Sequence, residues 1–295
     1  MKLDNQSIRR SVAVVTLALA GFAGTAQAQA IYASADEAAK AFVHALSVND
    51  PQALTTVLGP NWRRFVPTQG LDHDDVIAFL GAWAKSNRVV TQGKTAHLQV
   101  GAQNWQLPIP IVDSGKGWRF DTKEAGDEIR TRRIGRNELD TMKSLLAAYD
   151  AQKEYATADR NGDGVLEYAQ RFVSTPGKQD GLYWASLPGE PRSPLGPLFD
   201  QALPGDGYHG YRYKLLTGQG RNAPGGAYDY MIKNRLVSGF AILAWPVRYG
   251  DTGVMSFMVS HDGKVYEKDL GANSAAAAKA ITRFDPDKSW KAVQP

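Results

Sequence analysis

The chain has 295 residues, of which 43% are hydrophobic and 22% are charged, with no cysteine and a formal net charge of +4. This composition is typical of a globular protein of one or two domains, and it excludes disulfide bonds and cysteine-ligated metals. The first thirty residues carry +2 of the net charge, and the small remainder gives no indication of nucleic-acid binding.

Residues 1–30 predict a secretory signal peptide. Basic residues at Lys2, Arg9 and Arg10 precede the apolar run SVAVVTLALAGFAG. Small residues two apart in GTAQAQA predict cleavage after Ala28 or Ala30. A membrane anchor is the weaker alternative, because the run is shorter than the about 20 apolar residues that span a bilayer. We therefore expect a periplasmic or secreted protein with no transmembrane segment in its mature chain.

Residues 31–136 predict an N-terminal α+β domain. Apolar residues at helical spacing predict three helices, one after the capping box of Ser34 and Glu37, one from Pro51 and one from near Asp72. Alternating apolar residues from 96 to 120 then predict antiparallel strands. The stretch from SADEAAKAFVHALSVNDPQAL to GKGWRFDTKEAGDEI resembles the nuclear transport factor 2-like fold, which implies a curved sheet cupped by helices.

Residues 137–295 predict a C-terminal domain that is also α+β. An apolar stripe predicts a long helix over 137–158, and VLEYAQRFV predicts a shorter helix after the polar run DRNGDG. Residues 174–204, rich in proline and glycine, predict an irregular connection. The remainder predicts antiparallel strands and a last helix in SAAAAKAITRF.

The loop at 159–170 matches most of a calcium-binding EF-hand loop, which supplies oxygens at alternate positions, a glycine at position 6 and a bidentate Glu at position 12. Counting from Asp159, position 6 is Gly164, but position 12 is Gln170, which lacks two charged oxygens. The oxygens expected to bind Ca²⁺ are the side chains of Asp159, Asn161, Asp163 and Glu167 and the carbonyl of Val165. Because Asp, Asn and Gly also build tight turns without metal, both interpretations stay open.

Evidence for catalysis is weak, because the chain has no G-x-S-x-G motif, no cysteine nucleophile and no histidine pair at zinc-ligand spacing. The candidates are His209 and Tyr211, expected on one strand face, and Asp229 on the next apparent strand. They suit general acid–base chemistry or sugar binding, whereas the plain alternative is a half-buried sheet face with hydrogen-bonded polar tips.

Two resemblances concern the longer patterns of the chain. The helix ELDTMKSLLAAYDAQKEYA with the strands HGYRYKLL and GFAILAWPVRYGDTGVMSFMVSHDGKVYEKDLG resembles the globular head of a type IV pilin or pseudopilin, which implies a helix packed on an antiparallel sheet. Over nearly the whole mature chain, specific strings resemble DUF2950, a bacterial exported family of unknown function. These strings are RRIGRNEL, GDGVLEYAQRF, DGLYW, SPLGPL, GYRYKLLTGQG, APGGAYDY, GFAILAWP and VYEKDLG.

The favoured interpretation is an exported cell-envelope protein that is not an enzyme. It would be an interaction or ligand-binding module for an unknown envelope protein or small ligand, with one structural calcium ion. The alternative is a periplasmic hydrolase acting on cell-wall or carbohydrate material. Convergence of the candidate groups in a deep pocket would favour the enzyme.

Overall fold

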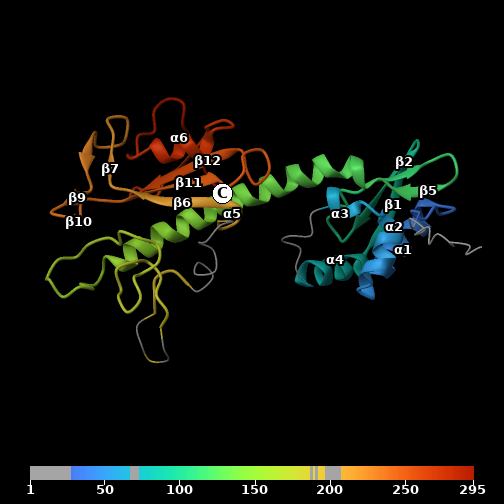
Figure 1. Ribbon diagram of the computed structural model, residues 1–295, viewed down its shortest axis with the longest axis horizontal. Helices are drawn as coiled ribbons and strands as arrows, with labels where there is room; N and C mark the ends of the chain where they lie inside the picture. Colours follow the sequence, from blue (N-terminus) through green and yellow to red (C-terminus); the bar gives the residue numbers. More distant parts are fainter. Residues whose placement is uncertain (1–27, 67–72, 187–188, 190–191, 197–206) are drawn as a thin grey trace, which may run out of the picture. The chain divides into compact units, whose positions relative to one another are not determined.

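The structure is a computed structural model that describes residues 28–66, 73–186, 189, 192–196 and 207–295. The predicted signal peptide up to residue 27 and part of the predicted irregular connection lie outside these residues. The chain forms two compact units, Met1–Lys123 and Glu124–Pro295 (Figure 1). Both combine helices with antiparallel sheets, so the predicted α+β class is confirmed.

The N-terminal unit begins with helices whose boundaries are set by capping residues close to them in sequence. Ser34 Oγ accepts the N–H of Glu37 at 3.1 Å, and Asp50 Oδ1 caps the next helix by accepting the N–H of Gln52 at 2.8 Å. Pro51 stands in the first turn of that helix, where its missing N–H costs nothing. The helices are α1 (Ala35–Ser47), α2 (Pro51–Leu58), α3 (Trp62–Phe65) and α4 (His73–Lys85).

An antiparallel sheet completes the N-terminal unit, in the order β1-β2-β4-β5, with β3 paired to β2. Its core is apolar: Leu98, Ile111 and Phe120 are fully buried, and the ring centroid of Phe120 lies 5.3 Å from that of Phe42 in α1. The strands are β1 (Asn87–Gln92), β2 (Thr95–Val100), β3 (Trp105–Gln106), β4 (Ile111–Asp113) and β5 (Trp118–Phe120).

Helix α5 (Thr122–Tyr155) begins well before the residue 137 predicted for it. The added turns carry mostly charged side chains, so they have no apolar stripe that a periodicity argument detects. Ion pairs along the helix connect them instead, with Arg130 2.6 Å from Asp127 and Arg132 2.7 Å from Glu128.

The predicted helix over residues 165–173 is wrong, because no helix forms there. The backbone of Ala169 bonds in both directions to the side chain of Gln152 in α5, with its N–H donating at 2.8 Å and its carbonyl accepting at 2.9 Å. The N–H of Tyr168 donates to the carbonyl of Leu236 at 2.7 Å. Partners distant in sequence therefore replace the helical hydrogen bonds.

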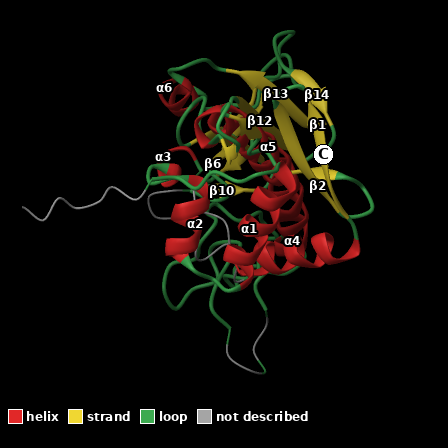
Figure 2. Cartoon of the chain, turned by 90° about the vertical axis from the view of Figure 1, so that its right-hand side faces the viewer, coloured by secondary structure: helices red, strands yellow, loops and turns green. Residues whose placement is uncertain are grey.

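The C-terminal unit is organised by an antiparallel sheet in the order β14-β13-β12-β11-β6, of which β12, β13 and β14 lie near the top of Figure 2. Helix α5 packs on one face, where Tyr213 of β6 contacts Thr141, and α6 contacts β11 on the other face. The elements are β6 (Tyr211–Leu216), β11 (Ala241–Pro246), β12 (Met255–Ser260), β13 (Val265–Asp269), α6 (Ser274–Ala280) and β14 (Lys291–Val293).

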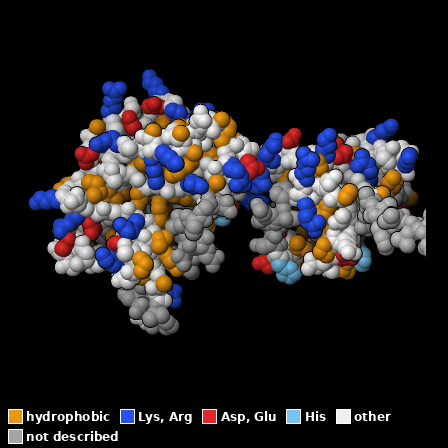
Figure 3. All heavy atoms as spheres, viewed as in Figure 1, with side chains coloured by type: hydrophobic (Ala, Val, Ile, Leu, Met, Phe, Trp, Pro, Cys, Tyr) orange, Lys and Arg blue, Asp and Glu red, His pale blue; other side chains and the backbone are white. Residues whose placement is uncertain are grey.

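Two short hairpins extend the C-terminal unit. They pair β7 (Gly218–Gln219) with β8 (Tyr228–Asp229), and β9 (Met231–Ile232) with β10 (Arg235–Leu236). On the face shown in Figure 3, lysine and arginine side chains of this unit are interspersed with acidic and apolar ones. Among the described residues, no helix is long and apolar enough to cross a membrane.

Candidate functional site

The loop that follows α5 is built around the carboxylate of Asp159. Its Oδ1 accepts the N–H of Asn161 at 3.2 Å and that of Gly162 at 2.8 Å, and its Oδ2 accepts the N–H of Gly164 at 2.7 Å. Gly162 and Gly164 have φ values of 75° and 80°, which glycine adopts without strain. The bond from Gly164, followed by the other backbone donors, lowers the pKa of Asp159, so this carboxylate stays ionised.

Glu167 approaches the same loop from its C-terminal side. Its Oε1 accepts the Nδ2–H of Asn161 at 2.9 Å, while its buried Oε2 has no hydrogen-bond partner in the described part of the chain. Burial first, then the charge of Asp163, raises the pKa of Glu167, and the nearby Arg235 opposes this shift. Arg235 itself pairs with Asp163. Glu167 therefore experiences the negative charges of Asp163 and Asp159 together with the positive charge of Arg235.

The structure supports only part of the EF-hand comparison. A helix precedes the loop but none follows it, and Gln170 donates its amide to the carbonyl of Asn234 at 2.9 Å. Within the described residues, no three acidic or histidine side chains already stand together as a group that could hold a metal ion. Calcium binding here would require Asn161 and Arg235 to give up their bonds to Glu167 and Asp163.

His209 does not share the strand face predicted for it. It has a φ of 50° in the turn before β6, so the extended alternation begins only at Tyr211. Its ring lies 4.1 Å from that of Tyr208, and its Nδ1 lies 4.0 Å from Asp140 Oδ2. These contacts place His209 against its neighbour Tyr208 and against Asp140 of α5.

Tyr211 and Asp229, the other catalytic candidates, have separate structural partners. Tyr211 is fully buried and donates its hydroxyl to the carbonyl of Met255 at 2.9 Å. Burial, with the nearby Glu138 carboxylate, raises the pKa of the Tyr211 phenol far above its usual value. Asp229 is largely exposed and pairs with Arg283. Among the described residues, no side chain contacts all three candidates, so a shared acid–base site receives no support.

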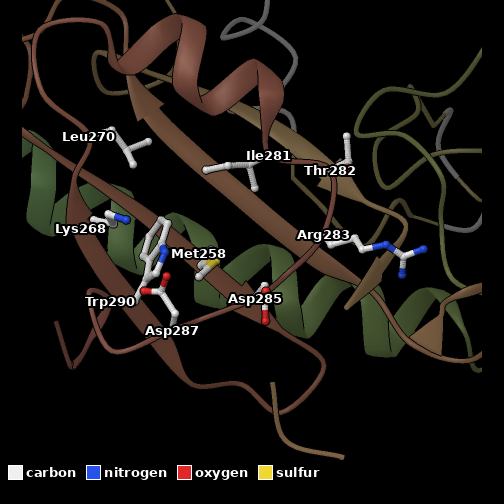
Figure 4. A pocket seen from close by; sticks show the side chains of 9 residues that line it. All are labelled: Met258, Lys268, Leu270, Ile281, Thr282, Arg283, Asp285, Asp287 and Trp290. Carbon is white, nitrogen blue, oxygen red and sulfur yellow. The ribbon is translucent and has the colours of Figure 1, made fainter. Parts of the chain in front are cut away.

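A pocket of about 320 Å³ lies on the α6 side of the C-terminal sheet (Figure 4). Met258 of β12 and Lys268 of β13 line it, together with Leu270 and the segment after α6 that ends at Trp290. The sequence does not indicate this pocket, because Lys268 is distant from FDPDKSW, whose two aspartates indicate only a turn.

Comparison with known proteins gives a family but no activity. Residues 29–293 match the family described as Protein of unknown function (DUF2950). The chain belongs to the DUF2950 family. No curated protein and no solved structure matches it. The function of this DUF2950 protein must therefore be argued from its own residues.

Proposed function

We propose that this DUF2950 protein is an exported component of the bacterial cell envelope. In this proposal it acts without catalysis, as an interaction or ligand-binding module, and residues 159–167 hold one structural calcium ion. The observation that supports the calcium part is the buried Oε2 of Glu167, which lacks a hydrogen-bond partner among the described residues and belongs to a carboxylate that feels the charges of Asp163 and Asp159.

Electrostatics favours a divalent cation at this position. Asp159, Asp163 and Glu167 bring three negative charges when ionised, and the ion pair with Arg235 offsets only one of them. Hard oxygen ligands of this kind suit Ca²⁺, which accepts irregular geometry and retains water in open positions. A calcium ion would displace Asn161 from Glu167 and Arg235 from Asp163. Its two positive charges would neutralise the carboxylates more strongly than these partners do.

A calcium-dependent melt tests this site. We expect residues 31–295 to unfold at a temperature several degrees higher in millimolar calcium than in EDTA, since a ligand at about 100 times its dissociation constant adds roughly 2.7 kcal/mol. Magnesium is the matched control, because it requires a tighter octahedral shell and loses water reluctantly. Coincident melts in calcium and EDTA would show that the loop is a turn stabilised by its own hydrogen bonds.

Export is tested by the mass of the protein recovered outside the cytoplasm. We expect the full chain, expressed in a bacterial host, to appear there beginning at Gln29 or Ile31, with the preceding peptide removed. Ala28→Arg is expected to block cleavage, because Ala28 belongs to both small-residue pairs, whereas Ala28→Ser preserves a small side chain. An uncleaved wild-type chain retained in the cytoplasm would contradict the proposal.

A further inference from the structure

The pocket on the α6 side of the C-terminal sheet has an apolar middle. Met258 is almost fully buried, and Leu270 and Ile281 are partly buried against the same core. Figure 4 shows the side chains of Leu270 and Ile281 pointing toward one another. A volume of about 320 Å³ is near the lower end of the range for small-molecule sites, so a ligand here must be small.

Two carboxylates at this pocket each keep one oxygen without a hydrogen bond among the described residues. Asp285 Oδ1 accepts the N–H and the Nδ2–H of Asn222, at 2.8 and 3.0 Å. Asp287 Oδ1 accepts the N–H of Ser289 at 2.8 Å and also its hydroxyl. In both residues these hydrogen bonds end on Oδ1, so each Oδ2 remains able to accept from a ligand.

The cationic side chains at the pocket differ in availability. The Lys268 ammonium lies 5.8 Å from the ring centroid of Trp290 and forms no hydrogen bond within the described part of the chain. Arg283 is already committed, since it pairs with Asp229 and donates to the carbonyl of Gln219 at 3.3 Å. Figure 4 shows its guanidinium extending away from the other polar side chains. Hydrogen bonds from Ser289, and to a smaller extent the charge of Lys268, lower the pKa of Asp287, but Lys268 and Asp287 form no ion pair. Two carboxylate oxygens and one ammonium without hydrogen bonds among the described residues therefore face a ligand.

We propose that this pocket binds a free α-amino acid with an aliphatic side chain. Its ammonium would donate to Asp285 and Asp287, its carboxylate would accept from Lys268, and its side chain would pack on the apolar middle. A neutral sugar fits less well, because it offers no charged groups to the opposite charges of Asp287 and Lys268, and Trp290 is only 9% exposed and lies beneath Lys268. This inference names the ligand of the proposed binding module and does not depend on the calcium loop.

Calorimetric titration of residues 31–295 with L-leucine tests the assignment. We expect saturable binding that requires all three parts of the ligand, so leucinamide, 4-methylpentanoate and serine, which lack the carboxylate, the ammonium and the apolar chain respectively, should each bind at least about tenfold more weakly. Asp287→Asn and Lys268→Met should weaken leucine binding to a similar extent.

The matched control is Lys264→Met, because the Lys264 ammonium also lies over an aromatic ring, 5.5 Å from that of Tyr266, but it does not line the pocket. It should leave leucine affinity unchanged. Absence of leucine binding, or binding that survives both pocket variants, would overturn the assignment. The titration in EDTA separates this outcome from failure of the calcium proposal, which the melt decides independently.

Discussion

Replacing Glu138 with alanine is expected to lower the free energy of unfolding by about 2–6 kcal/mol. Glu138 Oε1 accepts the N–H of Val254 at 2.8 Å and that of Met255 at 2.9 Å, which ties α5 to the start of β12. The substitution leaves both part-buried donors without an acceptor, and each such loss costs about 1–3 kcal/mol. Urea denaturation of the variant beside wild type measures the difference.

Two further variants test whether the loss of stability comes from the missing hydrogen-bond acceptor at Glu138. Glu138→Gln retains an oxygen at the same place and should lose less than half as much stability. Glu154→Ala makes the same change at an exposed position of α5 and should stay within about 0.5 kcal/mol of wild type. Equal losses for Glu138→Ala and Glu154→Ala would contradict a role for these hydrogen bonds.

The same junction explains why Tyr211 is better understood as a structural residue than as a catalyst. Its hydroxyl lies 3.5 Å from Glu138 Oε1 and donates to Met255, so it is already engaged inside the core. Gly253 is needed for this close packing, because a Cβ at that position would lie 1.9 Å from the tyrosine oxygen. A general acid or base must instead reach a substrate.

Local signals in the sequence predict the parts of the fold whose partners are near in sequence. Ser34 caps the helix that it was expected to start, the helix expected from Pro51 begins there, and alternation over 96–100 corresponds to β2. The apolar pattern of VLEYAQRFV fails as a helix signal because Gln152, distant in sequence, satisfies the backbone of Ala169. Periodicity reports which residues are apolar, and tertiary contacts decide how they are buried.

In the candidate sites, too, the sequence predicts contacts between residues that are near in sequence and misses those between distant residues. Asp159 and its backbone donors lie within six consecutive residues, so the sequence alone indicates a loop rich in oxygen ligands there. The neighbouring charge of Arg235 comes from β10 and has no local signal. In the pocket, Lys268 and Asp287 belong to different segments that only the folded C-terminal unit brings together.

Glu167→Gln is expected to be more stable than wild type without calcium and less stable than wild type with calcium. In EDTA at neutral pH the variant should be more stable than wild type, because it removes a carboxylate that is partly desolvated and close to Asp163. In calcium at about 100 times its dissociation constant the wild type gains roughly 2.7 kcal/mol. The variant gains much less, since it has lost one charged ligand, and wild type becomes the more stable protein.

The pH dependence of stability in the calcium-free protein leads to the same expectation, that removing the Glu167 carboxylate stabilises the fold near neutral pH. The pKa of Glu167 is raised in the folded state, so its contribution to stability is complete below the ordinary pKa of glutamate and is lost as the pH rises through the folded value. Wild type and Glu167→Gln should therefore have similar stability near pH 4 in EDTA and diverge toward pH 7, with the variant more stable. Melts over this range measure the divergence, and Glu154→Gln serves as the exposed control. A simple turn predicts the same order of stability with and without calcium, whereas a metal site requires the order to invert.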